Sequence, residues 1–559
     1  MNNNETLEKI LADKFNVSAQ QWQECLHEHK KTAVSLVQVL VSKGLIDEDA
    51  LLNTLSLHLG IPYIKIESEN IDPELIKKIP SKLITYYNFM PLGLQNDALK
   101  IAINDPLDLS IIDEIKLFLN QEIAPVIARQ KDILGSIKNF YGVGAETIEA
   151  MSVAAPLNTE LLKIEQNKNI DNESIDPSVI KFLNQVLLDA IKQEATDIHF
   201  EPFENDLRIR YRIDGILYEI PCPPAIKQFQ TSIAARIKVM ANLDIAEKRR
   251  PQDGRIDVKL ENDAFDLRVS IIPTPFGESI GIRILPRSNQ IITLKGLGLT
   301  INELNLMEKM ISKPHGIILV TGPTGSGKTT TLYACLNKIN SAERKIITIE
   351  DPIEYQLRGI TQMQVDTKIS FTFANALRSM LRHDPNIMMV GEIRDSETAE
   401  LAVRTALTGH LVFSSLHTND AAGGITRLLD MGIDPFLVAS SVILIIAQRL
   451  VRKICPRCKE QYTPEPGLLK QFNGHKTWAT PLLHGRGCES CRFTGYKGRT
   501  GIFEMLEIND TIREMILKKM PSHQIKQLEM SSLKDAGWDK IKAGITTVEE
   551  VVKVAQEEI

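Results

Sequence analysis

The chain has 559 residues, a length that favours several domains over one. Its 43% hydrophobic content is typical of a globular protein with buried cores. The net charge of −6 does not favour a general nucleic-acid binder, because phosphate contacts need clustered lysine and arginine. The first residues lack the basic and apolar segments of a secretory signal, so we expect a cytoplasmic protein with reduced cysteines.

Residues 1–145 are expected to form a mainly helical N-terminal domain. Within it, Val34–Gly44 has the pattern of an apolar helix that ends at a glycine cap. Residues 146–176 are rich in alanine, asparagine, glutamate and serine, and this composition predicts a linker.

Residues 177–290 are expected to form a second, smaller α/β domain. The pattern predicts a helix over Val179–Ile191, and it predicts strands over Asp197–Glu201, Leu207–Ile213 and Ala264–Ser270. In the second strand, apolar residues alternate with Arg208, Arg210 and Arg212. The three guanidiniums should therefore share one face, where they are either solvated or matched to anions.

Residues 291–559 alternate apolar strands with helices, which predicts a parallel sheet covered on both faces. The most apolar run, Val442–Ala447, is far shorter than the ~20 residues of a membrane span. We expect it to be a buried helix.

The stretch Gly322–Thr329 reads GxxxxGK[ST], the pattern of a phosphate-binding P-loop. An apolar run precedes it and a helix-compatible run follows, which is the strand–loop–helix context that the motif needs. Lys328 would reach the β- and γ-phosphates, and the Thr329 hydroxyl would bind Mg²⁺. The residues expected to hold the nucleotide here are Gly322, Pro323, Thr324, Gly325, Ser326, Gly327, Lys328, Thr329 and Thr330.

Polar clusters also follow other strands of this domain. In open α/β sheets, ligands bind at the carboxyl ends of the strands. Glu392 is expected to orient or deprotonate the attacking water. Glu350, Asp351 and Glu354 are candidates to hold Mg²⁺ or its waters, although each could instead cap a neighbouring element. His410 and His417 are either structural residues or sensors of the γ-phosphate.

Four of the seven cysteines form two CxxC pairs, Cys455 with Cys458 and Cys488 with Cys491. Each pair can offer two thiolates to one tetrahedral Zn²⁺ at ~2.3 Å. Disulfides are the rival interpretation, and a reducing cytosol disfavours them. Gly487, Gly495 and Gly498 suit the tight turns of such a module.

The P-loop, Thr348–Glu354, Ile387–Asp395 and Gly409–Thr418 together resemble the Walker A, Asp, Walker B and His boxes of secretion (traffic) ATPases. The Gly391–Glu392 ending matches that family's variant of Walker B. The resemblance covers residues from about 177 to the end. It implies a multi-domain α/β protein, with a RecA-like P-loop ATPase domain, a PAS-like N2 domain and a helical N1 domain. It also implies a homo-hexameric ATP hydrolase that uses ATP and Mg²⁺.

The resemblance adds roles for individual residues. It implies that N2 arginines reach the nucleotide, and Arg210 and Arg212 are the first candidates, ahead of Arg268 and Arg283. It places Glu354 and His417 beside Glu392 among the catalytic candidates.

The long N-terminal region and the four cysteines resemble those of assembly motors rather than retraction motors, and the overall length favours pilus assembly over type II secretion. We therefore expect ATP-driven assembly of type IV pili, with pseudopilus assembly in type II secretion as the alternative. The implied partners are an inner-membrane platform protein and a cytosolic docking component bound through N1, which would give peripheral association with the inner membrane. A plasmid-transfer motor acting on DNA and a regulatory module without turnover are the competing classes, and no nucleic-acid partner is expected.

Some N1 domains of the family bind cyclic di-GMP through a motif that Ser35–Ile46 resembles in part. Here Ser35 replaces an arginine and Val37 replaces a glycine. Loss of the guanidinium removes a phosphate partner, so binding of cyclic di-GMP is not expected.

Overall fold

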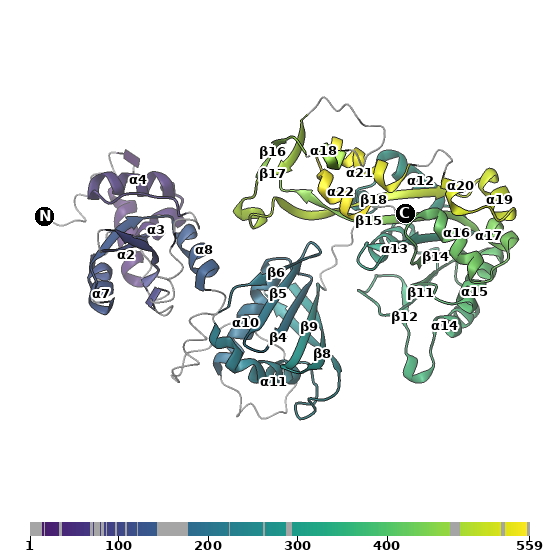
Figure 1. Ribbon diagram of the computed structural model, residues 1–559, viewed down its shortest axis with the longest axis horizontal. Coiled ribbons are helices and arrows are strands. Elements are labelled where there is room, and N and C mark those ends of the chain that lie inside the picture. The colour runs from purple at the N-terminus through teal and green to yellow at the C-terminus, as the bar shows by residue number, and fades with distance from the viewer. Residues whose placement is uncertain are drawn as a thin grey trace. The chain divides into compact units, whose positions relative to one another are not determined.

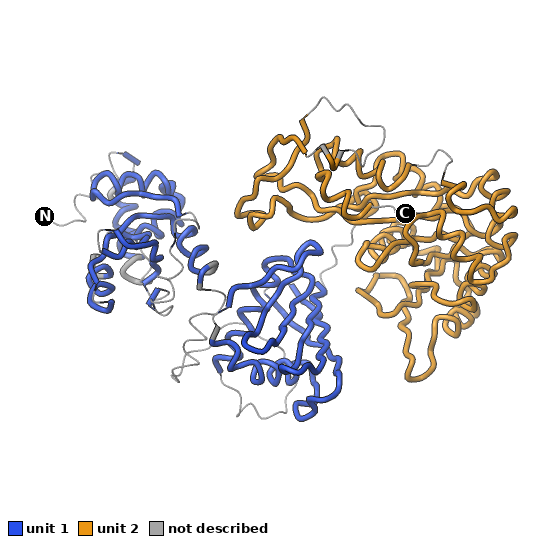
Figure 2. The backbone as a smooth tube through the Cα atoms, in the orientation of Figure 1, with its two compact units in different colours: residues 1–286 blue, residues 287–559 orange. Residues whose placement is uncertain are grey.

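The protein is represented by a computed structural model. It describes residues 14–15, 17–32, 36–66, 71, 79, 83–84, 87–95, 98–106, 109–119, 121–141, 177–222, 224–260, 263–286, 293–464, 466–469, 481–526 and 531–555. The expected linker, 146–176, lies outside these ranges. The chain divides into two compact units, residues 1–286 and 287–559 (Figure 2). Among the helices so described, none has the length and hydropathy that a membrane crossing requires.

The first part of unit 1 combines helices with a small sheet. Its elements are α2 (Ala19–Thr32), α3 (Leu36–Ser42), α4 (Glu48–Leu59), β1 (Met90–Gln95), β2 (Ala98–Ile103), α7 (Leu109–Leu119), β3 (Ile123–Ile127) and α8 (Gln130–Tyr141) (Figure 1). Strand β2 lies between β1, which is antiparallel to it, and β3, which is parallel. The helix expected at Val34–Gly44 is α3, and Gly44 follows it with a φ of 66°.

The second part of unit 1 is an antiparallel sheet packed against helices. Its elements are α10 (Pro177–Lys192), β4 (Asp197–Pro202), β5 (Leu207–Ile213), β6 (Ile216–Ile220), η3 (Pro224–Phe229), α11 (Gln230–Met240), β7 (Gln252–Leu260), β8 (Asp263–Thr274) and β9 (Gly277–Pro286). The six strands are ordered β6-β5-β4-β9-β8-β7. Tyr211 of β5 is buried and donates a hydrogen bond to the Val186 carbonyl of α10 at 2.8 Å. The helices therefore cover the apolar face of β5, and the arginines lie on its other face.

Unit 2 is built around one large sheet. Its first elements are η4 (Leu294–Leu297), α12 (Ile301–Ile311), β10 (Gly316–Thr321), α13 (Lys328–Ile339), β11 (Ile346–Glu350), β12 (Thr361–Gln364), η5 (Thr367–Ile369), α14 (Phe373–Met380), η6 (Leu381–His383), β13 (Ile387–Val390), α15 (Ser396–Leu407) and β14 (Leu411–Leu416). The remainder are α16 (Ala421–Asp430), α17 (Pro435–Ser441), β15 (Val442–Ile454), β16 (Lys459–Tyr462), α18 (Pro466–Leu469), β17 (Leu482–Gly485), η7 (Glu489–Cys491), β18 (Tyr496–Glu507), α19 (Asp510–Leu517), α20 (Ser522–Lys526), α21 (Leu533–Lys542) and α22 (Val548–Val554).

The seven strands of this sheet are ordered β12-β11-β13-β14-β10-β15-β18. The expected parallel arrangement holds from β12 to β15, whereas β18 is antiparallel to β15. Ile317 and Leu319 of β10 belong to the core formed with α14 to α17, and Ile318 and Val320 belong to the core formed with α12 and α13. Both faces of the sheet are therefore covered, as the continuous apolar strand sequences predict.

The expectation of a helix at Val442–Ala447 is wrong, because this run is the first half of β15. The strand lies between β10 and β18, and its first eight residues are buried. A strand covered on both faces shows no polar alternation, so its periodicity cannot be distinguished from that of a buried helix. The β-branched residues Val442, Ile443, Ile445 and Ile446 are the signal that favours a strand.

Candidate functional site

The P-loop connects β10 to α13 through residues 322–327 and packs tightly against β15. A Cβ atom on Gly322 would lie 2.6 Å from the Gln448 carbonyl oxygen, and one on Gly327 would lie 2.8 Å from Gln448 Nε2. Both glycines also have positive φ angles, 149° and 87°. The glycines of the motif are thus required by close approach and by backbone conformation.

Lys328 begins α13 and folds back over the loop. Its Nζ donates to the carbonyl oxygens of Gly322 at 2.7 Å and Pro323 at 3.2 Å. Burial lowers the pKa of Lys328, an effect that Glu392 opposes and Arg449 reinforces. Three charged groups are therefore close enough to influence one another around the loop.

Four parallel strands bring the sequence-predicted residues to one edge of the sheet. Strands β11, β13, β14 and β10 are successive neighbours, and their carboxyl ends precede the Asp box, the Walker B glutamate, the end of the His box and the P-loop. The Glu392 side chain is only 14% exposed. Its carboxylate forms an ion pair with Arg394 and lies 3.1 Å from His417 Nε2. Arg394 also approaches Asp351 at 3.9 Å, so Asp351 belongs to this cluster.

The two histidines lie at opposite ends of β14. His417 follows the strand and contacts Glu392, as described above. His410 precedes the strand, where Leu411 pairs with Gly316 at the start of β10, and its Nδ1 lies 3.1 Å from the Thr405 carbonyl oxygen. Of the two roles left open for His410, this position favours the structural one, because it lies at the amino ends of the strands, away from the P-loop.

Glu350 is the last residue of β11 and is 3% exposed. Its carboxylate accepts hydrogen bonds from Thr348 at 2.6 Å, from Gln362 at 3.0 Å and from the Tyr333 hydroxyl. Burial raises the pKa of Glu350, and these hydrogen bonds oppose that rise. These contacts favour a structural role over metal binding, because a metal would have to replace donors that already satisfy the carboxylate.

Glu354 is half-buried, four residues beyond Glu350. The amide nitrogen of Glu354 lies 3.4 Å from the Tyr333 hydroxyl oxygen. Tyr333 belongs to α13, the helix that begins at the P-loop. The Asp-box segment is thereby fixed to the P-loop helix through one buried phenol.

Sequence reasoning gave no role to four residues of this region: Arg394, Tyr333, Gln448 and Arg449. Arg394 lies within the Walker B segment, beside a glutamate already singled out, so a charge-pair search could have found it. Gln448 and Arg449 directly follow an apolar run in the sequence. They are buried because that run and these two residues belong to one strand, β15.

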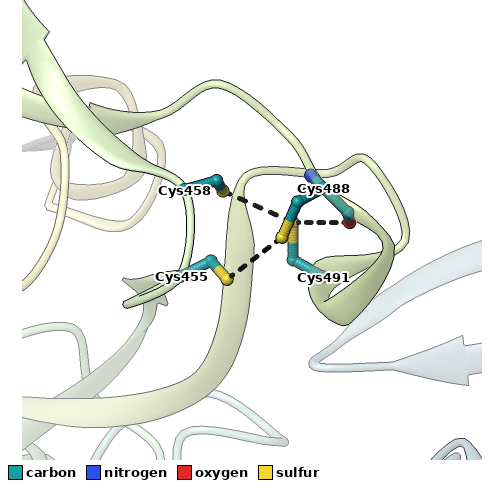
Figure 3. Close-up of side chains that lie close together, drawn as sticks. All are labelled: Cys455, Cys458, Cys488 and Cys491. Carbon is teal, nitrogen blue, oxygen red and sulfur yellow. Dashed lines mark hydrogen bonds between the residues drawn. The ribbon is translucent and has the colours of Figure 1, made fainter. Parts of the chain in front are cut away.

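The four cysteines of the CxxC pairs converge in space (Figure 3). Their Sγ atoms all lie within 4.8 Å of one another, and three S···S distances are 3.7, 3.7 and 3.8 Å. A tetrahedral zinc site with Zn–S bonds of ~2.3 Å has S···S edges of about 3.8 Å. The cluster has the number, type and spacing of donors that a structural zinc ion needs, and these separations exceed the ~2.05 Å of a disulfide.

The three glycines near the second cysteine pair have positive φ angles of 96°, 79° and 75°, as tight turns require. Cys455, Cys458 and Cys491 are at most 4% exposed. The amide of Cys488 donates to Cys491 Sγ at 3.1 Å, a contact that stabilises a thiolate. The sulfur cluster is thus preorganised by its own backbone.

The fold and the site define a P-loop ATPase, with a strand–loop–helix phosphate cradle at the end of β10 and a carboxylate at the end of β13, two strands away in the same sheet. The chain belongs to the type II/IV secretion system protein family, whose model matches residues 172–553. An MshEN domain model matches residues 59–147. ATP hydrolysis is the activity of this family and of this chain.

Curated relatives extend along the whole chain. The chain is 40% identical over 557 residues to the type IV pilus assembly ATPase PilB of Myxococcus xanthus, covering 98% of each. It is 46% identical over 431 residues to the type II secretion system ATPase E of Vibrio cholerae, covering 77% of this chain and 84% of the relative.

Among solved structures, the ATPase DotB of Legionella pneumophila matches with a TM-score of 0.52 at 19% identity. The match covers 69% of this chain and 97% of that one. It supports the multi-domain α/β, RecA-like fold.

Proposed function

We propose that this chain is a cytoplasmic motor that hydrolyses ATP to power type IV pilus assembly, the polymerisation of pilin, at the inner membrane. The observation that carries the proposal is the match to a pilus assembly ATPase over 98% of both chains. A match confined to the ATPase domain would leave the N-terminal 171 residues, and with them the docking of the motor, without support.

Type II secretion is the second candidate function. The higher identity of 46% to a type II secretion ATPase over 431 residues favours it. A deletion strain of the source organism separates the two. Loss of surface pili with normal export of secreted enzymes supports the proposal, whereas the reverse pattern supports type II secretion. A deletion strain that keeps both its surface pili and its export of secreted enzymes would contradict both candidate functions.

The proposed reaction uses the residues that surround the P-loop. Backbone amides of residues 322–329 and Lys328 bind the phosphates, and the Thr329 hydroxyl binds Mg²⁺. Glu392 orients the attacking water, while Arg394 and His417 fix the Glu392 carboxylate. Asp351 and Glu354 are proposed to act on water molecules of the hydrated metal rather than on the metal directly.

Arginines of the six-stranded sheet are proposed to supply further positive charge to the nucleotide. Arg210 is paired with Glu201 at 2.6 Å, and Arg212 lies 3.6 Å from Asp197. Arg268 of β8 lies opposite Arg283 of β9. Both line a cavity of about 510 Å³, and Arg283 pairs with Asp197 at 3.1 Å, so they are proposed as candidates beside Arg210 and Arg212.

Alanine substitutions compare the β5 arginines, represented by Arg210, with the pair Arg268 and Arg283, represented by Arg268. Arg268→Ala is expected to lower kcat by about 10- to 100-fold, the effect of one lost charge-assisted contact of ~1.5–3 kcal/mol. Arg210→Ala is expected to lower kcat less, because Glu201 already neutralises Arg210. Phosphate-release assays measure both, with circular dichroism as the check on folding. Unchanged kcat in both variants would assign the arginines to a solvated face.

The four cysteines are proposed to bind one structural Zn²⁺. All four ligand positions are filled by sulfur, so no open position is left for catalysis. A disulfide alternative would require pairs of sulfurs at bonding distance.

The N-terminal region is proposed to dock a cytosolic component of the pilus machine and, through it, the membrane platform protein. Large apolar side chains on α4 and α7 support this proposal: Leu57 is 81% exposed, Leu117 is 83% exposed and Phe118 is 73% exposed. Such side chains gain free energy when a partner covers them.

Cyclic di-GMP is not proposed as a ligand of Ser35–Ile46. Because an MshEN domain model matches residues 59–147, binding of cyclic di-GMP should be measured directly. Val37 is 1% exposed and occupies the position at which the binding motif has glycine. Ser35 lies outside the described residues. Isothermal titration with the full chain is expected to give no heat of binding. A micromolar dissociation constant would contradict this expectation.

A homo-hexamer is proposed as the working assembly, because closed rings are the solution for head-to-tail contacts that do not form filaments. Mass photometry with ATP and Mg²⁺ should give a species of six chains. Steady-state ATPase assays with and without DNA address the other classes: strong stimulation by DNA would support a nucleic-acid motor, and absent turnover would support a regulatory module.

A further inference from the structure

Gln448 and Arg449 are buried polar residues of β15 that lie beside the P-loop. Ala447 pairs with Thr321, the last residue of β10, so the next two residues of β15 extend past the point where the P-loop begins. Gln448 is 2% exposed and Arg449 is 9% exposed. Polar side chains are buried in this way only when other groups satisfy them, so their contacts indicate what they do.

Gln448 contacts both ends of the P-loop. Its Oε1 accepts a hydrogen bond from Thr331 Oγ1, in the first turn of α13, at 2.6 Å. Its carbonyl oxygen and Nε2 are the atoms that a Cβ on Gly322 or Gly327 would meet. The end of β15 is therefore packed directly against the phosphate cradle.

The Arg449 guanidinium lies between the start of the P-loop and the segment that follows β14, and a Cβ on Gly322 would lie 3.1 Å from its Nη1. Its Nη2 donates to Asn419 O at 2.9 Å and to Asn419 Oδ1 at 3.3 Å, and its Nη1 donates to Gln448 O at 3.1 Å. All three of these acceptors are uncharged oxygens: two backbone carbonyls and one side-chain amide. The guanidinium thus joins Asn419 to the end of β15, and its charge adds to the burial that lowers the pKa of Lys328.

Residues 417–420 form a short connection in which each residue has a different partner. The partners, in chain order, are Glu392, Thr321, Arg449 and Lys526. His417, which contacts Glu392, is two residues from Asn419, which Arg449 holds. The position of the His417 ring therefore depends on the two residues that follow it, which are held by Thr321 of β10 and by Arg449 of β15.

We propose that Arg449 is a positioning residue for ATP hydrolysis. It fixes Asn419 so that His417 faces Glu392, while its neighbour Gln448 fixes the same strand end to the P-loop. Arg449 acts through His417 and Glu392, and its effect should appear in the chemical step rather than in nucleotide binding.

The test is Arg449→Gln, which removes the fork of donors. We expect kcat to fall about 10- to 100-fold, the range for a misplaced catalytic group. The affinity for a fluorescent ATP analogue should change by less than about threefold, because the P-loop contacts remain. Arg449→Lys should recover part of kcat, since one ammonium can still donate to Asn419 O.

Arg452→Gln is the matched control. Arg452 lies on the same strand and is paired with Glu550 at 2.6 Å, in a contact that involves no residue of the site. Its loss should lower the Tm, as the loss of Arg449 also does, without a comparable fall in kcat. Equal falls of kcat in the two variants at equal losses of Tm would reduce Arg449 to a residue of general stability and overturn the proposal.

A double-mutant cycle tests the route of the effect. If Arg449 acts through His417, Arg449→Gln should cost little more in a His417→Ala background, because coupled residues are not additive. The same fold-loss in both backgrounds overturns this route. An unchanged kcat in Arg449→Gln, or a loss confined to ATP affinity, also overturns the assignment.

Discussion

Glu392→Gln is expected to bind ATP with near-normal affinity and to hydrolyse it about 10³-fold more slowly, within the range for loss of a general base or water-orienting group. The substitution keeps the size of the side chain and removes its charge. Arg394 and His417 then lose the charged acceptor that fixes them, and the attacking water loses its guide. Because the P-loop itself is unchanged, phosphate binding should persist.

The measurement pairs a phosphate-release assay with binding of a fluorescent ATP analogue. Glu397→Gln is a matched control, because Glu397 lies in the first turn of α15, its side chain is 59% exposed, and it pairs with Arg378 on the surface. The control should keep wild-type kcat. Normal turnover in Glu392→Gln would remove Glu392 as the water-orienting residue and direct attention to Glu354.

Cys458→Ser is expected to cause the largest loss of stability. Structural zinc contributes ~10–16 kcal/mol in small zinc-binding peptides, so a site with one weakened ligand should release the metal and unfold its module. Metal analysis should give about one zinc per wild-type chain and much less in the variant. Thermal unfolding of the variant should begin at lower temperature.

Cys222→Ser is the control for this experiment, because Cys222 lies in unit 1, outside the cluster. It should retain about one zinc per chain, because the substitution removes no sulfur of the cluster. A wild-type protein that folds without metal, or a Cys458→Ser variant that keeps both zinc and its Tm, would contradict the tetrathiolate proposal.

The elements that sequence predicts well are those whose geometry is local. The P-loop could be recognised because glycine spacing, lysine and the following helix all lie within eight residues. The alternation of β5 predicts that its arginines share one face, and the two CxxC pairs predict a cluster of four sulfurs. The convergence of the strand ends followed from parallel β/α alternation alone.

Sequence reasoning is less informative where burial or long-range pairing decides the role of a residue. Glu350 reads as a site carboxylate, and only its contacts with Tyr333 and Gln362 assign it to the interior. His410 precedes its strand by one residue, and the direction of the strand moves it to the far edge of the sheet. Arg449 could not be assigned from sequence, because its partner Asn419 is contributed by a different strand end.

The cysteine cluster closes the connection between β15 and β18, whose last paired residues there are Ile454 and Tyr496. Cys455 directly follows β15 and is six positions from Arg449, a span of ~20 Å at the rise of extended backbone, with one register shift in the pairing to β18 between Arg452 and Ile454. The hydrogen-bonded pair of strands β15 and β18 resists bending more than a loop of the same length. A load applied at the cysteine cluster would therefore be transmitted along β15 to the residues that contact the P-loop, which is the coupling that the proposed motor function requires.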